Sequence, residues 1–147
     1  MRILVLNGIN LNMTGLRQPE VYGSETLEDI NKEIAEYAAK NGAECDFFQT
    51  NFEGELAEKL HGARSVYDGI VLNAGAWTHY SYGIRDAIAS IDLPVVETHM
   101  SDITKREEFR RLSVIAPVCA HTIMGFGKYS YIKAVEWLLQ NEVKEDD

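Results

Sequence analysis

Short apolar runs alternate along the chain with longer segments in which apolar residues recur every three or four positions. Continuous apolar runs are typical of strands covered on both faces, whereas the second pattern is typical of amphipathic helices. We expect strands at residues 3–6, 45–49, 68–73, 93–99 and 118–124. We expect helices near residues 27–42, 52–63 and 84–91, a short one from Thr104, and a last one near 132–139.

This alternation of strand and helix over 147 residues predicts a single domain, 1–147. We expect an α/β fold, a flavodoxin-like doubly wound three-layer sandwich whose five-stranded parallel sheet has the strand order 2-1-3-4-5. In such a sheet, ligands bind at the carboxyl ends of the strands, beside the point where the strand order reverses.

The longest connection, residues 7–23, follows the first strand at that edge. It contains three Asn, three Gly, one Pro, Arg17 and Tyr22. Connections of this kind usually have about two to six residues, and longer ones often carry function. We therefore interpret it as part of a site, with a lid at about residues 10–23. A plain solvated loop is the alternative.

The net charge of -9 opposes binding to nucleic acid or to an anionic membrane, because phosphate binding needs a basic face. An anionic ligand would have to be collected by individual Arg residues. The apolar run at the start is too short for a signal peptide, and no run approaches the roughly 18 apolar residues of a spanning helix, so we expect a cytoplasmic protein. Cys45 and Cys119 lie in apolar segments and are expected to be buried free thiols.

Polar residues follow the first, third and fourth predicted strands and should meet at one edge of the sheet. They are Asn7, Asn10, Asn12, Arg17, Tyr22, Asn73, His79, Glu97, His99 and Ser101, with Arg106 and Arg110 shortly after. Each has a structural alternative, since Asn often caps a turn and paired Arg often lie on a solvated helix face. Glu97 and His99 are two apart on a strand and point to one side, so that the carboxylate could orient the imidazole.

Other kinds of chemistry have weaker support. Two His and one Glu lack recognisable metal-ligand spacing, and His61 and His121 are expected to be structural. The lysines lie on or at the start of predicted helices or in the tail, which gives no Schiff-base candidate. No Ser, Thr or Cys nucleophile follows a recognisable elbow. Thr104 and Glu107 have capping-box spacing, which is the basis for the short helix.

Five blocks of sequence carry a resemblance to a known family. They are Asn7-Gly8-x-Asn10-Leu11-Asn12, then Arg17-x-Pro19 with Tyr22-Gly23, then Asn73-Ala74-Gly75-Ala76-x-Thr78-His79, then Arg85-Asp86-Ala87, and Glu97-x-His99-x-Ser101 followed by 106–111. In order and spacing, over nearly the whole chain, they resemble the type II 3-dehydroquinate dehydratases. The chain departs from the family pattern at four positions. It has Ile9 where the family usually has Pro, Gln18 in place of Glu, Thr98 in place of an aliphatic residue, and His121 where Gly is common.

The resemblance implies conversion of 3-dehydroquinate to 3-dehydroshikimate by loss of water through an enolate, without metal, cofactor or covalent intermediate. It implies that Tyr22 is the base, that Arg17 favours its anion, that Asn10 helps to stabilise the enolate and that His99 protonates the leaving hydroxyl. The implied substrate-binding residues are Asn73, His79, Asp86, Met100, Ser101 and Arg110. It also implies a homo-oligomer, a dodecamer built of trimers, in which Asp86 reaches a neighbouring site and Arg106 makes a loop or subunit contact.

A non-catalytic flavodoxin-like module is the alternative. A flavin module would have a phosphate loop rich in Ser, Thr and Gly after the first strand, but this loop is rich in Asn. A phospho-receiver would have acidic residues after the first and third strands, where this chain has Asn7 and Asn73. An inert interaction domain would leave Arg17 and Tyr22 unexplained.

Overall fold

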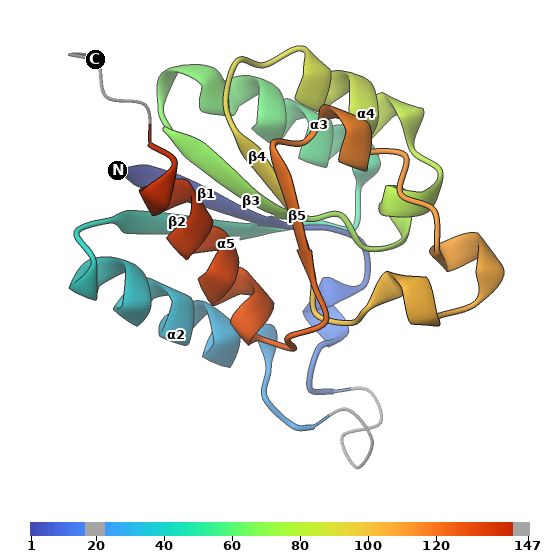
Figure 1. Cartoon of the computed structure of the whole chain (residues 1–147), viewed down its shortest axis with the longest axis horizontal. Helices are drawn as coiled ribbons and strands as arrows, with labels where there is room; N and C mark the ends of the chain where they lie inside the picture. Colours follow the sequence, from blue (N-terminus) through green and yellow to red (C-terminus); the bar gives the residue numbers. More distant parts are fainter. Residues whose placement is uncertain (17–22, 143–147) are drawn as a thin grey trace.

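A five-stranded, all-parallel sheet forms the centre of the molecule (Figure 1). The computed structural model of the chain describes residues 1–16 and 23–142. The strands are β1 (Arg2–Asn7), β2 (Glu44–Gln49), β3 (Gly69–Asn73), β4 (Val95–His99) and β5 (His121–Met124). Their order is β2-β1-β3-β4-β5, which confirms the predicted order and the doubly wound α/β fold.

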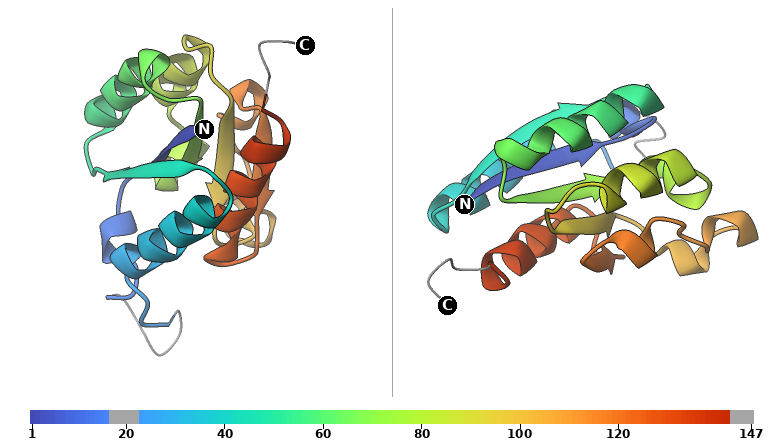
Figure 2. Two further views of the ribbon diagram at one scale, coloured as in Figure 1. Left: turned by 90° about the vertical axis from the view of Figure 1, so that its left-hand side faces the viewer. Right: turned by 90° about the horizontal axis from the view of Figure 1, so that it is seen from above.

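Helices cover both faces of the sheet (Figure 2). They are α2 (Leu27–Lys40), α3 (Glu53–Gly62), α4 (Tyr82–Ala89) and α5 (Tyr129–Gln140). Side chains alternate along β1: Ile3 and Val5 pack with α2 and α5, whereas Leu4 and Leu6 pack with α3 and α4. The two buried clusters make the three layers expected from the sequence.

The predicted helix after Thr104 is wrong. The chain between β4 and β5 instead forms 3-10 turns at Ile103–Lys105, Glu108–Arg110 and Ala116–Val118. Thr104 does not cap a helix, because Asp102 caps the first turn and accepts hydrogen bonds from the Thr104 backbone N–H and hydroxyl. Arg106 and Arg110 therefore do not share a helix face.

Two predicted strands begin two or more residues later than expected. β4 begins at Val95, after Pro94, and β5 begins at His121, because the segment before it belongs to a 3-10 turn that has a Pro in its first positions. Cys119 ends that turn. Cys45 and Cys119 are free thiols as expected, but each is only partly buried. Burial raises the pKa of the Cys45 thiol to about 11 and that of Cys119 to about 12, so both stay protonated at neutral pH.

The loops after β1 and β3 lie against each other at the carboxyl edge of the sheet. The Gly8 N–H donates to Asn73 O at 2.8 Å, and a Cβ on Gly8 would lie 2.5 Å from Ala74 O, so only glycine fits there. Arg17, Gln18 and Tyr22 of the predicted lid lie outside the described residues, as does the acidic tail from 143 onward. Within the described part of the chain, no helix is long and apolar enough to cross a membrane.

Candidate active site

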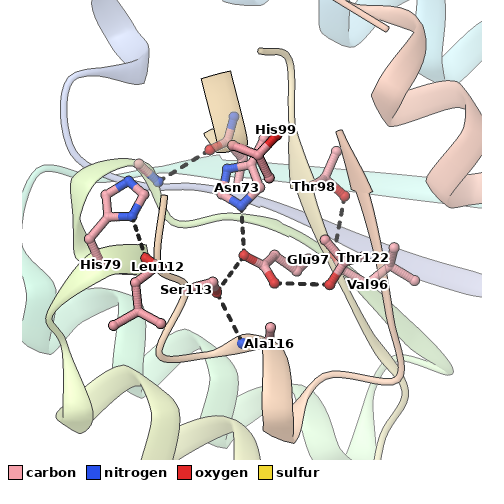
Figure 3. Close-up of polar contacts among 12 residues, drawn as sticks. Asn73, His79, Val96, Glu97, Thr98, His99, Leu112, Ser113, Ala116 and Thr122 are labelled. Carbon is pink, nitrogen blue, oxygen red and sulfur yellow. Dashed lines mark hydrogen bonds and ion pairs between the residues drawn. The ribbon is translucent and has the colours of Figure 1, made fainter. Parts of the chain in front are cut away.

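A buried carboxylate–imidazole pair occupies the end of β4 (Figure 3). Glu97 is fully buried and His99 is 6% exposed, and the His99 Nε2 lies 2.7 Å from Glu97 Oε2. This contact agrees with the expected side-by-side placement of the two residues, and the orienting role of Glu97 stays a prediction. An ionised carboxylate only accepts hydrogen bonds, so Nε2 carries a hydrogen and Nδ1 is the nitrogen left to face a ligand.

Two further donors hold the same carboxylate. The Ser113 hydroxyl lies 2.6 Å from Glu97 Oε2, and the Thr122 hydroxyl lies 3.0 Å from Oε1. Burial on its own would raise the pKa of Glu97, but the hydrogen bonds from His99, Ser113 and Thr122 outweigh it and place that pKa below its ordinary value. Glu97 is consequently a buried anion at neutral pH.

Asn10 is held by its backbone in an uncommon conformation. Its φ of 69° lies in the left-handed region, which Asn tolerates better than most residues. The Asn10 N–H donates to Asn51 Oδ1 at 2.9 Å, and Gln49 Nε2 donates to that oxygen at 3.0 Å and to Gly8 O at 3.1 Å. Because the backbone is fixed in this way, the exposed Asn10 side chain is presented at the carboxyl edge of the sheet.

A buried phenol ties together the ends of β1 and β3. The Tyr131 hydroxyl of α5 donates to Asn7 Oδ1 at 2.5 Å and accepts from Asn73 Nδ2 at 2.9 Å. Asn73 Oδ1 also accepts from the Gly75 N–H at 3.2 Å. Burial raises the pKa of the Tyr131 phenol, which keeps it neutral. Asn73 therefore positions the loop that follows it, and its predicted contact with substrate stays a prediction.

His79 and Arg110 approach the edge from two different segments. His79 Nδ1 lies 2.8 Å from Leu112 O, and because a carbonyl only accepts, Nδ1 carries the hydrogen and Nε2 is left for a ligand. Arg110 is partly buried, and its Nε donates to Glu107 Oε2 at 2.7 Å. The Arg110 hydrogen bond and charge lower the pKa of Glu107.

The remaining predicted residues are less closely gathered. Met100 packs against the cluster on the α2 and α5 face, and its carbonyl accepts from the Gly127 N–H at 2.9 Å. Ser101 and Arg106 are exposed, and Asp86 lies on the exposed side of α4. The structure describes neither Arg17 nor Tyr22, so their predicted roles stay predictions. His121, predicted to be structural, lies at the opposite end of the sheet, where it stacks on Trp137 at 5.1 Å.

Three residues with contacts at this edge were not predicted from the sequence, namely Asn51, Ser113 and Thr122. Thr122 pairs with Glu97 in the register of β4 and β5, so aligning the two predicted strands could have found it. The other two come from irregular segments that have no periodic signal. Among residues 1–16 and 23–142, no group of three or more His, Cys, Asp or Glu side chains is arranged to hold a metal ion.

Comparison with known proteins identifies the family. A family model described as "Dehydroquinase class II" matches residues 1–139. The chain belongs to this family. A 3-dehydroquinate dehydratase of Bacillus pumilus is 53% identical over 136 residues, covering 92% of each chain. One of Nitratiruptor is 50% identical over 131 residues, covering 89% of this chain and 84% of the relative.

Solved structures agree with the family match. A type II dehydroquinase of Butyrivibrio crossotus superposes with a TM-score of 0.90 at 45% identity, covering 94% of this chain and 97% of that one. One of Propionibacterium acnes also has a TM-score of 0.90, at 37% identity, covering 95% of this chain and 97% of that one. The resemblance found in the sequence is confirmed, and this dehydroquinase is an enzyme of the hydro-lyase class. The non-catalytic alternative is not favoured.

Proposed function

We propose that this dehydroquinase converts 3-dehydroquinate to 3-dehydroshikimate by eliminating water through an enolate. The buried Glu97–His99 pair is the observation that carries the proposal, because a carboxylate-oriented imidazole suits protonation of a leaving hydroxyl. The family match and the names of the relatives supply the substrate.

The first step removes the proton next to the substrate ketone. The Tyr22 phenolate takes this proton, and the electrons of the C–H bond pass into the enolate. Arg17 favours the phenolate over the phenol by its positive charge. Asn10 helps to hold the water that stabilises the enolate oxygen. Fixing the Asn10 backbone in advance reduces the reorganisation needed when this charge develops.

The second step expels the hydroxyl on the neighbouring carbon. His99, as imidazolium, gives its proton to this oxygen while the C–O bond breaks, and the products are water and a conjugated enone. Arg110 binds the substrate carboxylate through the guanidinium nitrogens that its bond to Glu107 leaves free. His79, Asn73, Ser101 and the backbone at Met100 contact the substrate hydroxyl groups.

The assembly we propose is a homo-oligomer, a dodecamer of trimers. Asp86 projects from the exposed side of α4, which suits contact with a neighbouring site. Light scattering tests this, and a fully active monomer would refute it. The cytoplasmic location expected from the sequence is part of the proposal, and cell fractionation would test it.

Ultraviolet absorbance of the conjugated enone, followed after 3-dehydroquinate is added, tests the activity directly. We expect His99→Ala to lose most of the turnover while it remains folded, which circular dichroism checks. The matched control is His61, an exposed histidine near the end of α3 that has no proposed part in the reaction. His61→Ala should be as active as the unaltered protein. Absence of enone with the unaltered protein would overturn the proposed function.

A further inference from the structure

The Glu97 carboxylate is held by more donors than orientation of His99 requires. Oε2 accepts from both His99 Nε2 at 2.7 Å and the Ser113 hydroxyl at 2.6 Å, and Oε1 accepts from the Thr122 hydroxyl at 3.0 Å. Figure 3 shows the carboxylate between the three side chains. One donor comes from β4, one from the turns after it and one from β5.

Both hydroxyl groups are directed by the surrounding backbone. The Ser113 oxygen accepts a hydrogen bond from the Ala116 N–H at 3.1 Å, so the Ser113 hydrogen is left to point at Glu97. Thr122 is the register partner of Glu97 on the adjacent parallel strand, so its side chain emerges on the same face of the sheet. Neither donor depends on a flexible side chain.

A buried pair of carboxylate and imidazolium can lose its charges by moving one proton. If the Nε2 proton passed to Glu97, a neutral carboxylic acid would face a neutral imidazole, and His99 would be a weaker acid toward substrate. Hydroxyl groups that donate to the carboxylate stabilise its anion and oppose this transfer. The net lowering of the pKa of Glu97 agrees with this direction.

We propose that Ser113 and Thr122 are positioning residues that keep Glu97 ionised, so that His99 delivers its Nδ1 proton to the leaving oxygen and keeps the proton on Nε2. This inference rests on the proposed function and deepens it. The Nδ1–H bond breaks, an O–H bond forms, and the C–O bond releases its electron pair to the departing water. Glu97 neither gains nor loses a proton.

Among the described residues, the titratable groups that act on Glu97 are few. His99 lies on the same strand. Cys119 lies in the segment that precedes β5, and the charge of Glu97 contributes to raising the pKa of its thiol. The pKa of Cys119 is raised to about 12, so its thiol is neutral throughout the working range. A change in pH dependence after removal of a hydroxyl is therefore attributable to the Glu97–His99 pair.

Thr122→Val tests the proposal, because valine keeps the shape of threonine and removes the hydroxyl. We expect the part of the acidic limb of the pH profile of kcat that reports protonation of Glu97 to move upward by about one pH unit, as loss of one hydrogen bond to a charged group implies. KM should change by less than about twofold, since Thr122 does not touch substrate in this arrangement. Thr122→Ser should restore the original profile.

Thr98→Val is the matched control. Thr98 is the next residue along β4 after Glu97, so its side chain is on the other face, where its hydroxyl donates to Val96 O at 3.1 Å. An aliphatic residue is also what the family usually has at that position. The control should keep the pH profile of the unaltered enzyme. Equal profiles for Thr122→Val and Thr98→Val would overturn the proposal.

Ser113→Ala is the second variant, to be used if Thr122→Val does not fold, and it should move the same limb in the same direction. An unchanged limb would again count against the proposal. Failure of this inference is distinguishable from failure of the proposed function. If His99→Ala is inactive while Thr122→Val and Ser113→Ala keep the original pH profile of kcat, only the role given to Ser113 and Thr122 is refuted. If His99→Ala stays active, the proposed role of His99 as proton donor falls first.

Discussion

Replacing Glu97 by Gln removes one charge from the candidate active site with little change in shape. A glutamine oxygen at the place of Oε2 can still accept from His99 and Ser113, as the carboxylate does. Its amide group then donates to Thr122, whose hydroxyl can accept as well as donate. Each hydrogen bond therefore has a replacement, and the main loss is electrostatic.

The size of that loss follows from the contact. The two charges are centred about 4 Å apart, and at an effective dielectric near 20 they attract by roughly 4 kcal/mol. Both side chains are buried, so screening by solvent reduces this little. If the imidazolium loses most of this attraction in the transition state, kcat should fall by roughly 100- to 1,000-fold.

Steady-state rates of enone formation, with thermal unfolding of the same samples, measure the effect. We expect Glu97→Gln to show the fall in kcat with a nearly unchanged KM while the protein remains folded. A folded Glu97→Gln enzyme with kcat within about tenfold of the original would refute the reasoning, because the charge would then contribute less than about 1.4 kcal/mol.

Three further outcomes are expected. Tyr131→Phe should lower the free energy of unfolding by about 2–4 kcal/mol in urea titrations, because it leaves polar atoms of Asn7 and Asn73 buried without a partner. Loss of the exposed Tyr67 hydroxyl should cost less than about 1 kcal/mol. Equal losses would contradict a stabilising role for the hydrogen bonds that join Tyr131 to Asn7 and Asn73. Tyr22→Phe should abolish most of kcat and spare substrate binding, which isothermal titration and rate measurements separate; a retained kcat would exclude Tyr22 as the base. The depressed pKa of Glu97 contributes stability that is present above the unfolded-state pKa of about 4.3 and is lost as pH falls through the folded-state pKa. The loss of folded protein with falling pH, monitored by circular dichroism, should therefore be steeper in the original enzyme than in Glu97→Gln. Identical acid transitions would count against this contribution of Glu97.

The parts of the molecule that repeat regularly were predictable from the sequence. Alternating strands and helices predicted the parallel sheet, the choice of a flavodoxin-like fold supplied its strand order, and strand geometry placed Glu97 beside His99. The segment after β4 was mispredicted because spacing alone cannot show that Asp102 takes the hydrogen bonds of Thr104. Asn51 and Ser113 could not be found because they act from irregular segments, through contacts with residues distant in the sequence.

The Tyr131 bridge has a consequence for the order in which the molecule is made. Asn7 and Asn73 are synthesised early, but the hydroxyl that joins them belongs to the last helix, 124 residues after Asn7. Until α5 docks, the amides at the ends of β1 and β3 lack this shared partner, so the nascent sheet can form while its carboxyl edge is still unfinished. Contacts so far apart in sequence form late and slowly. A ribosome-bound chain arrested before α5 emerges should therefore carry strands whose carboxyl edge is not yet ordered by Tyr131.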